Sequence, residues 1–333
     1  MNAPSATKPA HLYAIDLLRF LAAMGVVLCH WCFAPPHTIM QVSGAKYGIF
    51  GVQMFFLISG FVILLSAQGQ DLRSFVVARA TRLYPAFWIC CTISALVAFT
   101  DPLLGWPEYF YNMTMLPDQA YVKLINQAYW TLFIEAKFYL LIAVLILCGA
   151  LRRIEGVMWV WLFACALSTS FLANHLLMGR YAPFFVGGCT CFLLRQRPTA
   201  TRWALFLVAW MLGMKAIAFE VSTNGGGLDM LTSCLLVTSF FLAMLAIARD
   251  WVVVPPLKTV ATLGAISYPI YLLHQRIEIE FGWTTDSPAL LLAAFVWIIV
   301  LSYVVHRWAE LPLQRWMKAR LARAAARPLA EQH

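Results

Sequence analysis

The sequence has few charged residues and no long polar segment. Of its 333 residues, 12% are Asp, Glu, Lys or Arg and 62% are hydrophobic, whereas an ordinary soluble domain is about half apolar and about a quarter charged. No stretch outside the apolar runs is long enough to bury a core of its own. These shortages exclude a soluble globular fold and predict one membrane domain with short loops.

The sequence also lacks the cysteine spacing of a disulfide framework or a metal site. Nearly all of the nine cysteines lie in apolar runs, where a free thiol behaves as a small hydrophobic group. Cys189 and Cys191 are too close together for a CxxC pair, and no second pair completes a zinc site. We expect no bound metal. We also expect no cleavable signal peptide, because the first apolar run contains Arg19 and continues past any small-residue cleavage pattern.

Ten apolar runs approach or exceed the roughly 20 residues that a helix needs to cross a bilayer. They lie at residues 12–34, 47–67, 76–99, 128–150, 157–175, 181–194, 203–219, 229–248, 260–281 and 288–306. The sixth run is short and contains Gly187 and Gly188, which predicts a helix that is tilted, broken or packed closely against a neighbour. We predict an all-α polytopic membrane bundle of about ten helices at 12–307, between an N-terminal segment, 1–11, and a basic tail, 308–333.

The basic residues follow membrane topology. The net charge of +9 would indicate a nucleic-acid partner only if these residues gathered on one face. Instead, most of the 24 Lys and Arg residues fall in the N-terminal segment, in alternate loops and in the C-terminal tail. By the positive-inside rule, both termini are predicted to be cytoplasmic, with an even number of spans. We expect contact with a lipid bilayer and none with nucleic acid.

Two ionisable residues of the first span, Arg19 and His30, share one helical face. They are 11 residues apart, which is close to three full turns and about 16 Å along the axis. Ionisable groups within spans usually face the bundle interior and mark function. Arg19 could therefore bind an anion near the cytoplasmic mouth, and His30 could carry out proton chemistry in the outer half. The alternative is that Arg19 reaches the headgroups and His30 only bonds a neighbouring helix.

Two further arginines, Arg79 and Arg82, stand three residues apart at the start of the third span. They occupy adjacent turns of one face, and the planar donor fork of each guanidinium suits phosphate oxygens. The alternative is that they are topogenic charges beside anionic headgroups.

The fourth span contains a carboxylate, Glu135, with Tyr139 one turn further on the same face. If this span begins near residue 128 at the outer surface, Glu135 lies about 10 Å deep, close to the depth inferred for His30. Glu135 could then orient His30 as a general base. The alternative is a structural polar pair that joins two helices.

The ninth span carries His274 and Arg276 in its outer half. With Tyr139 they are candidates for binding the substrate, either the acceptor or a developing oxyanion. The alternative is that Arg276 only pairs with Glu280, four residues on.

Five short motifs occur in order along the chain. They are IDLLRFLAAMGVVLCHW with Arg19 and His30, GVQMFFLISGFVI, RATRLYP with Arg79 and Arg82, WTLFIEAKFY with Glu135 and Tyr139, and ISYPIYLLH ending at His274. Together they resemble membrane acyltransferase family 3, the O-acetylases of bacterial surface polysaccharides and related substrates. The resemblance covers nearly the whole chain.

This resemblance implies an enzyme of the bacterial cytoplasmic (inner) membrane. It would transfer an acyl group, usually acetyl, from cytoplasmic acetyl-CoA or another acyl-CoA to a hydroxyl of an extracytoplasmic or lipid-linked glycan. Arg19, Arg79 and Arg82 would hold CoA phosphates, and His30 with Glu135 would activate the acceptor or handle an acyl intermediate. Many members carry an extra hydrolase-like domain that this sequence lacks, so we expect the chain to act alone or with a partner protein. The acceptor, the acyl chain, the role of His30 as base or acylated group, and the oligomeric state stay open.

The main alternative function is a transporter or flippase for a polysaccharide precursor or a small anion. Intramembrane Arg, Glu and His residues also mark substrate and proton pathways. Against this, the sequence has no convincing inverted repeat, and its buried charges at two depths suit a donor arm. A third alternative is a non-catalytic assembly subunit, for which clustered ionisable groups would be a needless cost.

Overall fold

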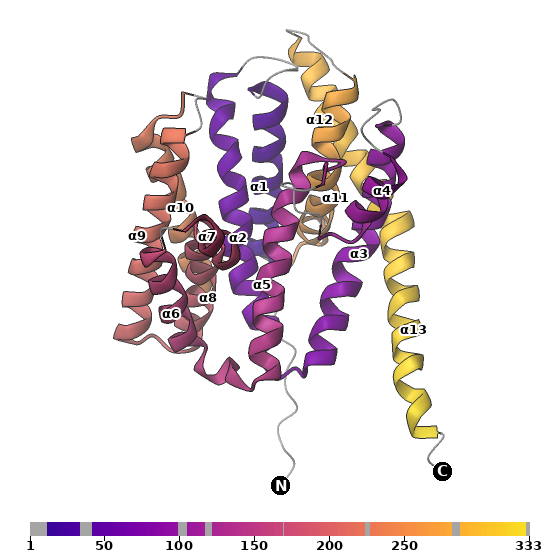
Figure 1. The fold of residues 1–333 in the computed structure, drawn as a ribbon. Helices are drawn as coiled ribbons and strands as arrows, with labels where there is room; N and C mark the ends of the chain where they lie inside the picture. The colour runs from indigo at the N-terminus through magenta and orange to yellow at the C-terminus, as the bar shows by residue number, and fades with distance from the viewer. Residues whose placement is uncertain are drawn as a thin grey trace.

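The structure is a bundle of long helices that run roughly side by side (Figure 1). It is a computed structural model and describes residues 12–33, 42–98, 105–116, 122–168, 170–223, 227–281 and 287–330. The α-helices are α1 Tyr13–Cys32, α2 Gly51–Ala67, α3 Leu72–Val97, α4 Trp106–Met113, α5 Trp130–Leu147, α6 Ile154–Leu167, α7 Phe171–Leu177, α8 Ala182–Gln196, α9 Ala200–Thr223, α10 Met230–Ala248, α11 Lys258–Phe281, α12 Pro288–Val304 and α13 Leu311–Ala330. Short 3-10 helices η1 Ser43–Phe50, η2 Gln127–Tyr129 and η3 Ala150–Arg153 precede α2, α5 and α6, and a π-helical segment η4 Val305–Glu310 joins α12 to α13.

The predicted all-α membrane bundle is confirmed. Eight helices in the described part of the chain are long and apolar enough to cross a membrane. The two remaining predicted spans correspond to α6, which has 14 residues, and α11, which has 24. Figure 1 shows α13 projecting on the side of the bundle where α1 begins. We call this the terminal side and the opposite one the distal side.

The sixth predicted span is the helix α8, and it lies at the centre of the bundle. It packs against α2, α6, α9 and α10, and most of its side chains are buried. A Cβ atom added at Gly188 would lie 1.9 Å from the Leu57 carbonyl oxygen, and one added at Gly60 would lie 2.1 Å from the Phe185 carbonyl oxygen. The predicted close packing is therefore present, and it fixes the position of α2 where Ser59 adjoins Gly60.

The helical chain does not end where the tenth apolar run ends, near residue 306. The helical chain continues through η4 into α13, which packs against α3. Residues 1–11, predicted as an N-terminal segment, lie outside the described part.

Candidate active site

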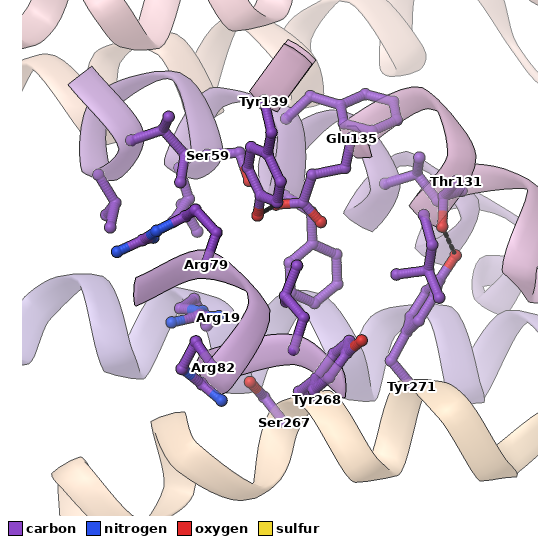
Figure 2. A pocket seen from close by; sticks show the side chains of 18 residues that line it. Arg19, Ser59, Arg79, Arg82, Thr131, Glu135, Tyr139, Ser267, Tyr268 and Tyr271 are labelled. Carbon is purple, nitrogen blue, oxygen red and sulfur yellow. Dashed lines mark hydrogen bonds between the residues drawn. The ribbon is translucent and has the colours of Figure 1, made fainter. Parts of the chain in front are cut away.

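A cavity of about 200 Å³ lies where α1, α2, α3, α5 and α11 meet. These five helices contribute both apolar and polar side chains to its wall. The polar lining residues, labelled in Figure 2, are Arg19, Ser59, Arg79, Arg82, Thr131, Glu135, Tyr139, Ser267, Tyr268 and Tyr271. Three of the helices carry residues that the sequence singled out, so α1, α3 and α5 bring their candidates into one chamber.

Three arginines form one end of the cavity. Arg19 comes from α1, Arg79 and Arg82 come from α3, and Figure 2 shows the three side chains grouped together. The Nε atoms of Arg19 and Arg79 are buried and have no hydrogen-bond partner in the described part of the chain. Buried polar groups in folded proteins normally have partners, and grouped guanidiniums repel one another. This end of the cavity is therefore suited to an anion.

Glu135 faces these arginines across the cavity. Its Oε1 atom accepts hydrogen bonds from the Ser59 hydroxyl and, at 2.5 Å, from the hydroxyl of Tyr139 one turn later. Among the described residues, Oε2 has no hydrogen-bond partner. Glu135 is thus held in place through Oε1. Its Oε2 atom stays available to hydrogen-bond a ligand in the cavity that the three arginines also line.

His30 lies in a different environment. Its ring is 5.2 Å from the ring of His274, and its Nδ1 atom is 3.5 Å from Nε2 of Gln275. His274 is fully buried, its Nδ1 donates to the Tyr271 carbonyl at 2.9 Å, and Trp31 of α1 donates to the His274 carbonyl at 3.2 Å. In the described structure, Nε2 of His274 has no hydrogen-bond partner.

The predicted meeting of His30 and Glu135 does not occur, since the described contacts of each do not include the other. Glu135 and His30 do not share a level as we inferred, because α5 begins below the distal ends of α1 and α2 (Figure 1). The buried side chain of Asn126 donates to the Leu272 carbonyl of α11 at 2.8 Å. The turn before α5 is thereby held below the distal ends of α1 and α2, as Figure 1 shows. Glu135 consequently lies at the arginine end of the cavity and not at the level of His30 and His274.

Tyr271 connects the two environments. Its ring is 5.6 Å from the ring of His274, and its hydroxyl is hydrogen-bonded to Oγ1 of Thr131 at 2.8 Å (Figure 2). Thr131 precedes Glu135 by one turn of α5. The histidine pair therefore adjoins the arginine cavity, with Tyr271 between them.

The structure can be compared with known proteins now that this geometry is described. The sequence matches the model of the acyltransferase domain of acyltransferase family 3 over residues 12–307. The chain belongs to acyltransferase family 3. No solved structure matches it.

Relatives of this acyltransferase family 3 chain include three named proteins. It is 30% identical to acyltransferase MdmB of Streptomyces mycarofaciens over 139 residues, 37% of this chain and 36% of that protein. It is 25% identical to nodulation protein 10 of Rhizobium leguminosarum bv. viciae over 315 residues, 82% of this chain and 85% of that protein. It is 29% identical to O-acetyltransferase OatA of Staphylococcus aureus over 160 residues, 41% of this chain and 25% of that protein. The match thus spans only about a third of MdmB and a quarter of OatA.

Some site residues of this family member were missed by sequence reasoning. Ser59 and Tyr271 lie inside two of the recognised motifs, and their polar groups in apolar spans were an available signal.

Arg276 is buried near His274 but does not line the cavity, and the side chain of Glu280, its alternative partner, lies outside the described part. Within the described residues, no group of His, Cys, Asp and Glu side chains is placed to hold a metal ion.

Proposed function

We propose that this chain is a membrane O-acyltransferase that uses acyl-CoA, with acetyl-CoA as the expected donor. The acceptor is a hydroxyl of an extracytoplasmic or lipid-linked glycan. Membership of acyltransferase family 3 supports acyl transfer, and an O-acetyltransferase is among the relatives. The donor binds at the arginine end of the cavity, and transfer takes place beside the pair of His30 and His274, which adjoins the cavity at Tyr271.

The observation that carries this proposal is the surplus of positive charge in the cavity. Arg19 and Arg79 present buried Nε atoms that no described residue satisfies, and Glu135 is the one carboxylate among the lining residues. Guanidinium groups bind phosphate oxygens through two parallel hydrogen bonds, and a phosphate-bearing donor would supply the missing acceptors. CoA carries such phosphates, so these guanidiniums suit it as a donor.

The distance between the two ends supports an acyl-CoA donor. Arg19 and His30 are about 16 Å apart along α1, which is comparable to an extended pantetheine arm. The arm would pass Glu135 and Tyr139 and reach the boundary formed by Thr131 and Tyr271. The thioester would then lie next to the histidine pair.

The chemistry requires a proton acceptor beside the thioester. The acceptor hydroxyl oxygen attacks the thioester carbonyl, a C–O bond forms, the C–S bond breaks, and the thiol of CoA leaves. His30 takes the proton of the hydroxyl and returns it to the thiolate sulfur. An acylated His30 would accomplish the same transfer in two steps.

Glu135 acts from the donor side of the cavity. Its Oε2 atom is available to hydrogen-bond the donor arm, and its charge offsets part of the charge of the three arginines. Tyr139 holds Glu135 in place, and His274 and Arg276 lie on the side of the acceptor. Glu135 and His30 thereby act at two separate places, Glu135 in the arginine cavity and His30 beside His274, and not as a contacting pair.

The charge bias of the loops supports an orientation in which the terminal side is cytoplasmic. In that orientation α1 begins on the side of the donor, so Arg19 precedes His30 along the donor path. The cytoplasmic membrane of a bacterium, the inner membrane in a Gram-negative cell, separates acyl-CoA from surface glycans and is the expected location.

The first test is donor binding by the purified protein. At about 100 times its Kd, a ligand that binds only the folded state stabilises it by about 2.7 kcal/mol. We expect acetyl-CoA to protect the protein from heat and a sugar alone to give no protection. Arg79→Ala should lose the protection, whereas Arg152→Ala, which removes an exposed arginine away from the cavity, should keep it.

The second test is the fate of a labelled acetyl group supplied to protein in vesicles. Label recovered on a glycan acceptor supports the proposal. Unchanged acetyl-CoA that accumulates inside the vesicles, with no label on the acceptor, contradicts it and favours the transporter.

A further inference from the structure

A buried carboxylate, Glu310, lies behind the arginine end of the cavity. Only 1% of its side chain is exposed. Its Oε1 atom is 3.2 Å from Nη1 of Arg82, and its Oε2 atom accepts a hydrogen bond from Nδ1 of His306 at 2.7 Å. Both carboxylate oxygens are therefore engaged, each by a different residue.

The local helix geometry places Glu310 there. Residues Val305–Glu310 form the π-helical segment η4, and the amide of Leu311 donates to the carbonyl of His306, five residues earlier. Pro312 follows directly and has no amide hydrogen to donate, and its ring crowds the preceding turn, which favours a distortion of the helix there. Such widened turns are often found at functional sites. This one packs against α3, the helix that carries Arg82.

Arg82 differs from the other two cavity arginines. It has a carboxylate ion pair, with Glu310, whereas within the described residues Arg19 and Arg79 have none at ion-pair distance. A guanidinium presents five donors in a flat fork. With Nη1 held by Glu310, the orientation of the Arg82 guanidinium is restricted while its remaining donors stay available to the cavity. Its side chain is 30% exposed, so without this anchor it would be free to turn away from the cavity.

We propose that Glu310 is a positioning residue for Arg82, and that His306 holds Glu310 in place from the opposite side. The π-helical turn between α12 and α13 is then part of the donor site, although it does not line the cavity. This inference rests on the proposed function, because it assumes that Arg82 binds phosphates of the donor. A buried ion pair by itself is weak evidence of a stabilising role, and the position of this pair beside the cavity is what indicates function.

The test is a double-mutant cycle on the full chain, with kcat and the KM for acetyl-CoA as readouts. Glu310→Gln should raise this KM about tenfold and change kcat by less than about threefold, as expected when donor binding is lost and chemistry is kept. Glu310→Asp keeps the charge and should give an intermediate KM. In the Arg82→Ala background, Glu310→Gln should have no further effect, because the residue acts through Arg82.

A matched control is available elsewhere in the chain. Glu155 pairs with Nε of Arg202 at 3.0 Å, between α6 and α9, and neither residue lines the cavity. Glu155→Gln should leave the KM for acetyl-CoA unchanged. A rise equal to that of Glu310→Gln would mean that the effect is a general loss of structure and would overturn the inference.

The remaining outcomes separate the two proposals. If Arg82→Ala alone leaves the KM unchanged, the role of Arg82 in the proposed function fails. If Arg82→Ala raises the KM but Glu310→Gln does not, or if Glu310→Gln raises it further in the Arg82→Ala background, the positioning role of Glu310 is overturned. If Glu310→Gln does not fold, the same comparison with Glu310→Asp decides.

Discussion

The hydroxyl of Tyr271 is hydrogen-bonded to Oγ1 of Thr131 at 2.8 Å, which joins α11 to α5 at the boundary between the arginine cavity and the histidine pair. The same hydroxyl is 3.2 Å from the Ala128 carbonyl oxygen. Both bonds hold the tyrosine ring, and the ring adjoins that of His274. The side chain of Tyr271 thus lies between the arginine cavity and the histidine pair.

Tyr271→Phe should lower the rate of acyl transfer more than the affinity for the donor. The substitution removes both hydrogen bonds and leaves the ring that adjoins His274 less well held. We expect kcat to fall about tenfold and stability to fall by about 1 kcal/mol, with little change in protection by acetyl-CoA. Tyr84→Phe removes a hydroxyl that donates to the Thr114 carbonyl away from the cavity and should leave kcat unchanged. An equal effect of both substitutions on kcat would contradict the role of Tyr271.

His30→Ala should abolish transfer and spare donor binding. Loss of a general base lowers rates by about 100-fold or more, and His30 does not contact the arginines that are proposed to bind the donor. Transfer assays with thermal protection by acetyl-CoA measure the two effects separately. His175→Ala, which removes a histidine of α7 that does not line the cavity, serves as the control. Full activity of His30→Ala would remove His30 from the mechanism.

Glu135→Gln should abolish transfer and also alter donor binding. The carboxylate lies in the same cavity as the three arginines, so its neutralisation changes the charge that the donor meets. Comparison of acetyl-CoA protection in this variant and in His30→Ala tests whether Glu135 acts with the arginines or with His30. If both variants lose transfer and neither changes donor protection, Glu135 belongs functionally with His30 and not with the arginines.

Gly188→Ala should strongly destabilise the bundle. The added Cβ atom would overlap the Leu57 carbonyl oxygen of α2, and overpacking of this kind costs about 1–3 kcal/mol or more. The control is Gly156→Ala in α6, where nothing lies within 4 Å of the new atom. That change should be neutral or stabilising by up to about 1 kcal/mol, since alanine favours the helix. Thermal unfolding of the two variants in the same detergent checks the difference.

The N-terminus of α3 should become less stable in acid. Asp71 caps this helix, and its hydrogen bonds with Ser74, including one from the backbone amide at 2.8 Å, lower the pKa of its carboxyl below the ordinary 3.8. A lowered folded-state pKa means that the stabilisation is complete above 3.8 and is lost as the pH falls through the lower folded value. Asp71→Ala should therefore speed amide exchange at Ser74 at neutral pH and remove the acid dependence. Asp71→Asn, which still accepts the hydrogen bond, should retain the slow exchange and lose the acid dependence.

Much of this architecture follows from local sequence. Apolar runs of bilayer length determine a helical membrane bundle, because a backbone in hydrocarbon must satisfy its own hydrogen bonds. Residue spacing along one helix placed Tyr139 next to Glu135 and placed Arg79 and Arg82 on one face. The short run with Gly187 and Gly188 indicated close packing, which the contact of Gly188 with Leu57 bears out.

The positions of helices relative to one another were decided only by the tertiary structure. Spacing along a helix determines the face and the rise of each residue, but it carries no information on how far one helix is shifted along its neighbour. The hydrogen bond from Asn126 to the Leu272 carbonyl ties the start of α5 to α11, below the distal ends of α1 and α2. Glu135 therefore lies beside the arginines and not beside His30. The pair between Arg82 and Glu310 joins residues 228 positions apart, so its formation depends on the packing of η4 against α3. The sequence alone determined that Arg19, His30 and Glu135 lie within membrane spans, whereas the burial of Glu310, which the sequence placed in the tail, and the contacts between helices were decided by the fold.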